Sequence, residues 1–389
     1  MNFNRHLLDV QPSASIQLMK RAKELQCKYG EKIIDLAGGE PDFSTPGIIC
    51  NEAIYALNQG YTHYTVGAGL PELRRRIADK LHKENGCSYS ESDIIVTPGA
   101  KFAVYLSLMA LINPGDEVII FRPGWVSYSP IIKSLGGKVN EIKLCVAEDY
   151  KFSLDLLEQA YTSKTRVMII NYPTNPTGKI LRADEAEILR EFLRRHNDLI
   201  LISDEIYEKI VFDDLKNISM AAYPDVADRV ITINGFSKAY AMTGWRLGYA
   251  AANSVVISEM YKIYQHMMTC VSGFIMKAGI KALTACDDEV EKMRLTYEKR
   301  RNDFINGLNN IKGVQCEYPE GTFYAWVRFM EAEKETSKFA EYLLDNARVI
   351  GIPGTAYGET EDIFMRFSFA NSEKRLESAV ENIRKLMEG

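Results

Sequence analysis

Short apolar runs rich in β-branched residues alternate with longer amphipathic stretches along the centre of the chain. The runs are DIIVT, EVIIF, RVMIIN, LILIS and RVITIN, at 93–97, 117–121, 166–171, 199–203 and 229–234. Helical periodicity lies between them, for example at 101–112 and 183–196. Strands that alternate with helices are typical of a mostly parallel sheet with helices on both faces. We therefore predict an α/β fold.

The pattern changes near residue 286. A long charged helical stretch is followed by the strand-like TFYAWVRF, a helix at 337–347, the strand-like DIFMRFSFA and a last amphipathic helix. This order is typical of a smaller α+β domain. We predict three parts, namely an N-terminal segment at 1–45 that packs with the small domain, a large domain at 46–285 and a small C-terminal α+β domain at 286–389.

Composition narrows the class of protein. The net charge is −5 and the basic residues are spread along the chain, which argues against a nucleic-acid surface. No apolar run approaches the length of a membrane span, and the first residues lack an apolar targeting stretch. Seven scattered cysteines and five histidines without metal-ligand spacing indicate reduced thiols and no catalytic metal. We predict a cytoplasmic protein that binds neither nucleic acid nor membrane.

Each predicted strand ends in residues that can carry chemistry. The five strands are followed by TPGAK, RPGW, YPTNPTG, DEIY and GFSK. Because parallel strands present their carboxyl ends on one edge of a sheet, where ligands bind in open α/β folds, these residues should share a crevice. The side chains that we expect there are Lys101, Trp125, Asn175, Asp204, Tyr207 and Lys238.

The stretch NGFSKAYAMTGWRLG places Lys238 and Arg246 eight positions apart after the last of these strands. A partly desolvated lysine near other cations suits a Schiff base, and an arginine fork suits a phosphate, to which Ser237 could add a donor. For the fragment alone, a solvent-exposed lysine in a loop of glycine and serine is the favoured interpretation. Gly99 and Ala100 precede a helix, and backbone N–H groups at a helix start bind phosphate.

Each of the other candidate residues could have either a functional or an ordinary structural role. A carboxylate such as Asp204 at the end of a buried strand needs a partner, either a pyridinium nitrogen or a following helix. Tyr207 and Trp125 suit either ligand contact or ordinary packing. Turn chemistry alone explains Asn175. Arg366 alternates with apolar residues in a strand and must be paired or meet an anionic ligand.

Taken together and in this order, the motifs resemble those of the fold-type I pyridoxal-phosphate enzymes, class I aminotransferases, and most of all the bacterial aspartate aminotransferase subgroup. The resemblance rests on LAGGEPDFSTP, THYTVGAGLPELR, TNPTG, SDEIY, GFSKAYAMTGWRLG and MRFSFA, and it covers nearly the whole chain. It implies a large domain that binds pyridoxal 5′-phosphate on a mostly parallel sheet flanked by helices, with a smaller α+β domain beside it.

The resemblance implies a role for each residue around the cofactor ring. Lys238 would carry the cofactor as an internal aldimine and then move a proton between the substrate Cα and C4′. Asp204 would keep the pyridine nitrogen protonated. Tyr207 and Asn175 would hydrogen-bond the phenolate oxygen, and Trp125 would stack on the ring.

The resemblance also implies how the phosphate is held. Arg246, Ser237 and the backbone at Gly99, Ala100 and Lys101 would bind it. Tyr64 would reach the phosphate in the neighbouring subunit, which implies a homodimer with shared active sites. Some members of the family have a serine at the position of Gly235, and related sequences often have a bulkier aromatic residue at the position of Gly124. Both positions therefore depart from these patterns.

For the substrate, the resemblance implies that Arg366 and the backbone of Gly39 bind the α-carboxylate, with Trp125 and Asn175 close by. Lys101 would bind a distal carboxylate, and Ser13 to Ser15 resemble a loop that closes over the substrate. The leading expectation is ping-pong transamination between aspartate and 2-oxoglutarate. The alternatives are an aminotransferase for prephenate, aromatic or other amino acids, a carbon–sulfur lyase, and a regulatory cofactor-binding domain. Amino acids and 2-oxo acids are the expected small-molecule partners.

Overall fold

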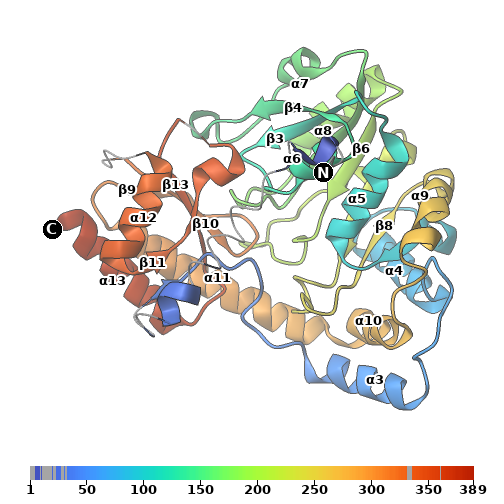
Figure 1. Cartoon of the computed structure of the whole chain (residues 1–389), viewed down its shortest axis with the longest axis horizontal. Coiled ribbons are helices and arrows are strands. Elements are labelled where there is room, and N and C mark those ends of the chain that lie inside the picture. The colour runs from blue at the N-terminus through green and yellow to red at the C-terminus, as the bar shows by residue number, and fades with distance from the viewer. Residues whose placement is uncertain are drawn as a thin grey trace.

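The computed structural model describes residues 5–8, 10, 20, 23–27, 30, 33–330, 335–359 and 361–389. A seven-stranded sheet forms its centre (Figure 1). In spatial order its strands are β2 (Ile94–Thr97), β8 (Gly248–Ala251), β7 (Val230–Gly235), β6 (Ile200–Asp204), β5 (Thr165–Asn171), β3 (Glu117–Arg122) and β4 (Lys138–Lys143). The α/β fold predicted from the sequence is confirmed.

All five predicted strands are present, and two further strands were not predicted. β4 is a partly exposed edge strand of mixed polar residues, and β8 is four small or aromatic residues long. β8 runs antiparallel to both of its neighbours, β2 and β7. β2 and β7 therefore run in the same direction, and their carboxyl ends lie on the same edge of the sheet, as expected.

Helices cover both faces of this sheet. They are α3 (Gly47–Asn58), α4 (Pro71–Asn85), α5 (Ala100–Leu111), α6 (Tyr128–Ser134), α7 (Leu154–Ala160), α8 (Ala183–Arg195), α9 (Ser254–Met267) and α10 (Gly273–Ala285), and a short α1 (Arg5–Leu8) lies near the amino end. Alternate strand residues enter different cores, since Ile94 and Val96 pack in one apolar cluster and Ile95 in another. None of the described helices is long and apolar enough to cross a membrane.

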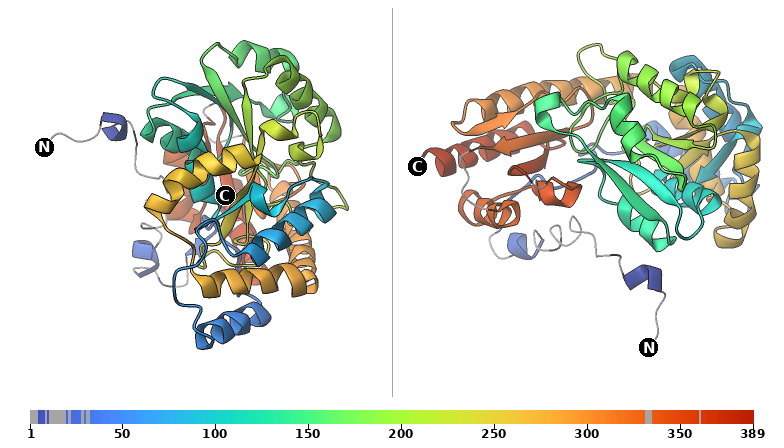
Figure 2. Two further views of the ribbon diagram at one scale, coloured as in Figure 1. Left: turned by 90° about the vertical axis from the view of Figure 1, so that its right-hand side faces the viewer. Right: turned by 90° about the horizontal axis from the view of Figure 1, so that it is seen from above.

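The C-terminal elements, in orange and red, gather at one end of the molecule (Figure 2). A four-stranded sheet contains β12 (Ile352–Pro353), β13 (Phe364–Ser368), β10 (Tyr324–Phe329) and β9 (Val314–Cys316). Its helices are α11 (Asp287–Asn309), α12 (Thr336–Ala347) and α13 (Glu373–Glu388). The long charged helix and both aromatic strands expected from the sequence are found here.

The N-terminal segment contacts the C-terminal elements. β1 (Ile34–Asp35) pairs in parallel with β11 (Val349–Ile350), and Asp42 forms an ion pair with Arg300 of α11 at 2.9 Å. The segment then passes to α3 beside the large sheet. The domain boundaries at 45 and 285 stay a prediction.

Candidate active site

A cleft of about 380 Å³ opens at the carboxyl ends of the large sheet and extends to the second sheet. Eleven of the predicted site residues line it, namely Gly39, Ala100, Lys101, Trp125, Asn175, Asp204, Tyr207, Ser237, Lys238, Arg246 and Arg366. They come from segments more than 300 residues apart in the chain. The expectation that the strand ends share one crevice is therefore met by the structure.

Lys238 follows β7 and is half-buried in the cleft. Its Nζ donates a hydrogen bond to the carbonyl oxygen of Gly39 and lies 5.7 Å from the centre of the Tyr207 ring. Burial and then the positive charge of Arg366 lower the pKa of the Lys238 amine to about 8. A sizeable fraction of this amine is thus neutral and nucleophilic near neutral pH.

Asp204 is the last residue of β6 and is buried beneath the cleft. The Tyr128 hydroxyl donates to its Oδ2 at 2.7 Å, and the Ile206 N–H donates to its Oδ1 at 3.3 Å. Burial raises the pKa of the Asp204 carboxyl to about 6, although the hydrogen bond from Tyr128 acts in the opposite direction. A cationic ligand group placed against Asp204 would offset that burial cost.

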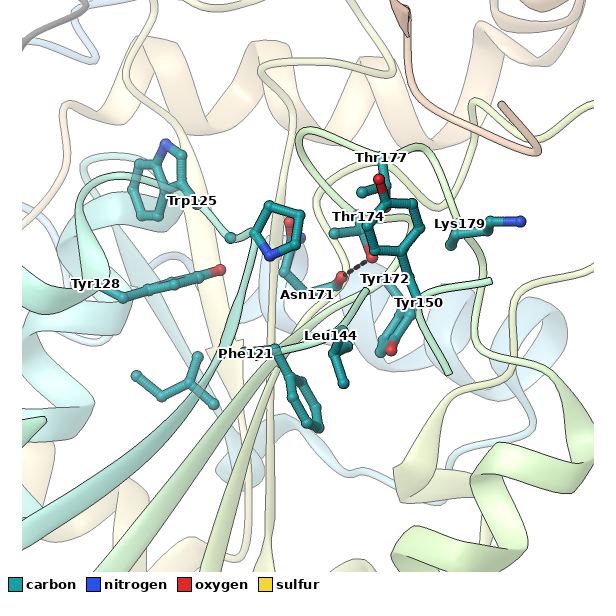
Figure 3. Close-up of a pocket in the computed structure, with 13 residues that line it drawn as sticks. Phe121, Trp125, Tyr128, Leu144, Tyr150, Asn171, Tyr172, Thr174, Thr177 and Lys179 are labelled. Carbon is teal, nitrogen blue, oxygen red and sulfur yellow. Dashed lines mark hydrogen bonds between the residues drawn. The ribbon is translucent and has the colours of Figure 1, made fainter. Parts of the chain in front are cut away.

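Tyr128 holds the side chain of Asp204 and Asn171 holds its backbone, and neither was singled out in the sequence. Asn171 lies beside Asp204 in the sheet, donates from Nδ2 to the Asp204 carbonyl at 2.9 Å and accepts from the Asn175 N–H at 3.0 Å. Figure 3 shows Tyr128, Asn171 and Trp125 around a smaller pocket that adjoins the cleft. Tyr128 comes three residues after Trp125, at the start of α6, which was the available signal.

The backbone at the start of α5 lies close to the side chain of Arg246 and to Gly248. Gly99 has φ +91°, and a Cβ there would lie 2.5 Å from Nη2 of Arg246. Arg246 itself has φ +56°, and its Nη1 donates to the Thr243 carbonyl at 2.7 Å. A Cβ at Gly248 would lie 2.5 Å from the Ala100 nitrogen. Glycine at both places therefore lets the guanidinium and the helix start come together.

The two departures from the family pattern have steric reasons. A Cβ at Gly235 would lie 2.8 Å from the Gly248 Cα, so a serine cannot occupy this position without displacing the backbone. A Cβ at Gly124 would lie 2.3 Å from the Phe121 carbonyl oxygen. Gly124 thus belongs to a tight turn on the wall of the smaller pocket.

Arg366 comes from β13 and is 5% exposed. It donates from Nη2 to the Ala37 carbonyl at 2.7 Å and from Nη1 to Asn175 Oδ1 at 3.2 Å, while its Nε has no partner among the described residues. Its guanidinium lies 4.1 Å from the centre of the Tyr324 ring. A buried guanidinium with neutral partners suits an anionic ligand.

Lys101, Tyr64 and Ser13 to Ser15 are the remaining predicted residues. The Nζ of Lys101 lies 5.0 Å from the centre of the Trp125 ring, and burial followed by the charge of Arg246 lowers the pKa of Lys101. Tyr64 is 86% exposed and does not line the cleft. Ser13 to Ser15 lie outside the described residues. Across the ranges that the structure describes, no His, Cys, Asp or Glu group could hold a metal ion.

Sequence and structure comparisons place the chain in a family. The model of the aminotransferase class I and II family matches residues 31–383. The chain belongs to the class I and II aminotransferases. It is 39% identical over 373 residues to the aspartate aminotransferase of Musicola paradisiaca, covering 95% of this chain and 93% of that protein. It is 38% identical over 363 residues to the aromatic-amino-acid aminotransferase 2 of Thermococcus litoralis, covering 92% of each.

A solved structure gives the same result. The aspartate aminotransferase from Rhizobium meliloti superposes with a TM-score of 0.95 at 34% sequence identity, covering 100% of this chain and 99% of that one. The predicted family and the predicted transaminase activity are confirmed. In this aminotransferase the cleft between the two sheets is therefore the candidate catalytic centre.

Asp204→Asn should stabilise this aminotransferase in its ligand-free state. Because the folded pKa is near 6 and the ordinary value is 3.8, the carboxyl destabilises the fold increasingly as pH rises from about 4 to 6, and fully above that. The asparagine stays neutral and can still accept from Tyr128. Urea unfolding at pH 7.5 should show a gain of about 3 kcal/mol that shrinks toward pH 4.5.

Asp213→Asn is the matched control, because the ion pair with Arg301 at 2.6 Å lowers the pKa of Asp213. That variant should lose stability at pH 7.5 or leave it unchanged. A loss of stability in Asp204→Asn at pH 7.5 would contradict the burial argument.

Proposed function

We propose that this aminotransferase uses pyridoxal 5′-phosphate and transfers the amino group of aspartate to 2-oxoglutarate in a ping-pong reaction. The observation that carries the proposal is the position of Lys238, a half-buried amine with a lowered pKa, among Asp204, Arg246 and Arg366 in one cleft. A lysine amine, a carboxylate and two guanidiniums match the aldehyde, the ring nitrogen, the phosphate and the substrate carboxylate of this chemistry.

The residues present fit the cofactor. The corner formed by Gly99, the start of α5 and Arg246 suits a phosphate, and Ser237 adds a hydroxyl. The buried carboxylate of Asp204 suits a protonated ring nitrogen, which would offset its burial cost. When bound, pyridoxal phosphate supplies an electron-withdrawing ring that stabilises negative charge at the substrate Cα.

The side chains of the cleft have separate chemical roles in this proposal. Lys238 would hold the cofactor covalently through its aldehyde carbon, with loss of water, and once freed by the substrate amine it would move a proton from the substrate Cα to that former aldehyde carbon. Asp204 holds the proton on the ring nitrogen, and Tyr128 keeps that carboxylate in place. The Tyr207 hydroxyl and the Asn175 amide face the same cleft and serve as hydrogen-bond partners of the ring oxygen.

Two cations select a dicarboxylate. Arg366, with the neighbouring backbone of Gly39, binds the α-carboxylate, and Lys101 at the cleft entrance binds the distal one. The aspartate aminotransferases among the relatives support this choice of substrate. The relative that is named for aromatic amino acids supports the second candidate. In that case Lys101 would stay on the Trp125 ring, where it lies in this structure. The apolar side chain of the substrate would then occupy the entrance of the cleft.

We also propose a homodimer in which Tyr64 completes the partner's phosphate site. Exposed apolar side chains gather on α3 and the loop after it, and they are Ile48, Ile54, Tyr55, Leu57, Tyr61, Tyr64 and Val66. Several exposed apolar side chains within one short stretch of chain are typical of an interface. The free cysteines, of which Cys27 and Cys145 are exposed, support a cytoplasmic location.

Lys238→Ala should abolish covalent attachment of the cofactor. Borohydride fixes pyridoxal phosphate to the amine with which it has condensed, so mass spectrometry of reduced wild-type protein should find the label on the peptide that contains Lys238. Lys101→Ala is the control, because it removes the other lysine that lines the cleft and should keep the label. Full labelling of Lys238→Ala would contradict the assignment.

Lys101→Ala should change substrate preference. A charge-assisted hydrogen bond contributes about 1.5–3 kcal/mol, so KM for aspartate should rise roughly tenfold or more while KM for phenylalanine stays within about twofold. Steady-state kinetics with both donors measure this. An equal rise for both donors would remove Lys101 as the specificity residue and favour the second candidate.

Tyr64→Ala and Lys238→Ala should complement each other if sites are shared. In a mixed dimer the subunit that keeps Lys238 receives an intact Tyr64 from its partner, so one site is restored. Random reassociation gives mixed dimers in half of the cases, so activity should reach about a quarter of the wild-type value. Activity no higher than the mean of the two unmixed variants would contradict a shared site.

A further inference from the structure

Tyr324 lies between the two halves of the proposed site. It begins β10, is 1% exposed and lines the cleft. Its hydroxyl oxygen is 2.9 Å from the hydroxyl oxygen of Tyr207, and its ring centre is 4.1 Å from the guanidinium carbon of Arg366. One side chain from the second sheet thus contacts both the ring-oxygen partner and the carboxylate-binding arginine.

The position of this side chain is tightly fixed. β10 pairs antiparallel with β13, which brings Tyr324 opposite Ser368, two residues after Arg366. Thr322 has φ +67°, and its Oγ1 accepts a hydrogen bond from the Tyr324 N–H at 3.2 Å. A Cβ at Gly39 would lie 3.3 Å from the Tyr324 hydroxyl, so the hydroxyl is held close to this backbone as well.

The chemistry of the two hydroxyls sets the direction of their hydrogen bond. A hydroxyl has one proton to donate. If Tyr207 donates its proton to the ring oxygen, it can only accept from Tyr324, and Tyr324 must be the donor in the 2.9 Å contact. Donation by Tyr324 polarises the Tyr207 hydroxyl and strengthens the bond that Tyr207 makes in turn.

The guanidinium completes the chain of contacts. A cation over the face of a phenol ring withdraws electron density from it, which makes the hydroxyl a better donor. A carboxylate that binds Arg366 partly neutralises this cation. Carboxylate binding therefore weakens donation by Tyr324, and through it the contact between Tyr207 and the ring oxygen.

We propose that Tyr324 is a positioning residue that couples carboxylate binding at Arg366 to the hydrogen bond between Tyr207 and the cofactor ring. This inference rests on the proposed function. Arg366 also donates to Asn175 Oδ1 at 3.2 Å, which forms a second and more direct connection. Tyr324 is thus expected to carry part of the coupling.

The test is a pH titration of the visible absorbance of the bound cofactor, with and without maleate, a dicarboxylate that has no amino group to react. Tyr324→Phe keeps the ring over Arg366 and removes only the hydroxyl. Because donors to the ring oxygen withdraw its negative charge and so lower the apparent pKa of the chromophore, this variant should raise that pKa by about half a pH unit. Maleate should raise it in the wild type, and by about half as much or less in the variant.

Tyr357→Phe is the matched control. It removes the hydroxyl of the other ring that faces Arg366, at 5.4 Å, including the contact of that hydroxyl with the guanidinium, and it leaves the contact between Tyr207 and Tyr324 intact. Its titration without maleate should follow that of the wild type. Identical titrations for Tyr324→Phe and the wild type, with the same response to maleate, would overturn the proposal.

Tyr207→Phe gives an independent answer if Tyr324→Phe does not fold. Since the chain of contacts ends at Tyr207, the response to maleate should fall by about half in this variant, and a full response would overturn the proposal. Tyr324→His replaces the hydroxyl with another hydrogen-bond donor. A wild-type titration in this variant, beside an altered one in Tyr324→Phe, would show that the donor and not the packing of the ring is responsible. Absence of any cofactor absorbance in the wild type would instead refute the proposed function.

Discussion

Burial of charge in one cleft is the constraint on which the site depends. Burial raises the pKa of Asp204 to about 6 and lowers that of Lys238 to about 8, so each group is drawn toward its neutral form. The roles proposed for Asp204, as the partner of a cation, and for Lys238, as a base, both depend on this burial. The same burial destabilises the ligand-free fold, and the aminotransferase tolerates this cost because two large apolar cores flank the sheet.

Backbone contact at three glycines fixes the geometry around these charges. Gly235 and Gly248 face each other across β7 and β8, and Gly248 in turn lies against the start of α5. Gly99 then leaves room for the Arg246 guanidinium. Side chains at these places would separate the lysine loop from the helix start. The absence of a serine at position 235 is thus a consequence of close packing, and it leaves Ser237 as the hydroxyl in the cleft wall.

Much of this arrangement could be predicted from the sequence because it is local. The apolar runs that end at Asn171, Asp204 and Gly235 identified the parallel strands, and the residues directly after each strand identified the site. Two classes of feature could not be predicted. β4 and β8 lack a clear pattern, since one is a mixed edge strand and the other is only four residues long. Tyr324 was missed because its contacts with Tyr207 and Arg366 join positions 117 and 42 residues apart (324 − 207 and 366 − 324).

The segment at 37–39 contacts two cationic side chains of the candidate site. The carbonyl of Ala37 accepts from Arg366, and that of Gly39 accepts from Lys238. Neutral carbonyls satisfy part of the hydrogen-bonding capacity of these buried cations without cancelling their charge, whereas a carboxylate in the same place would form a buried ion pair that a ligand would have to break. The two cations therefore stay ordered and still attract negative ligands. Because this segment also joins β1 to α3, the N-terminal part of the chain is an integral wall of the active site.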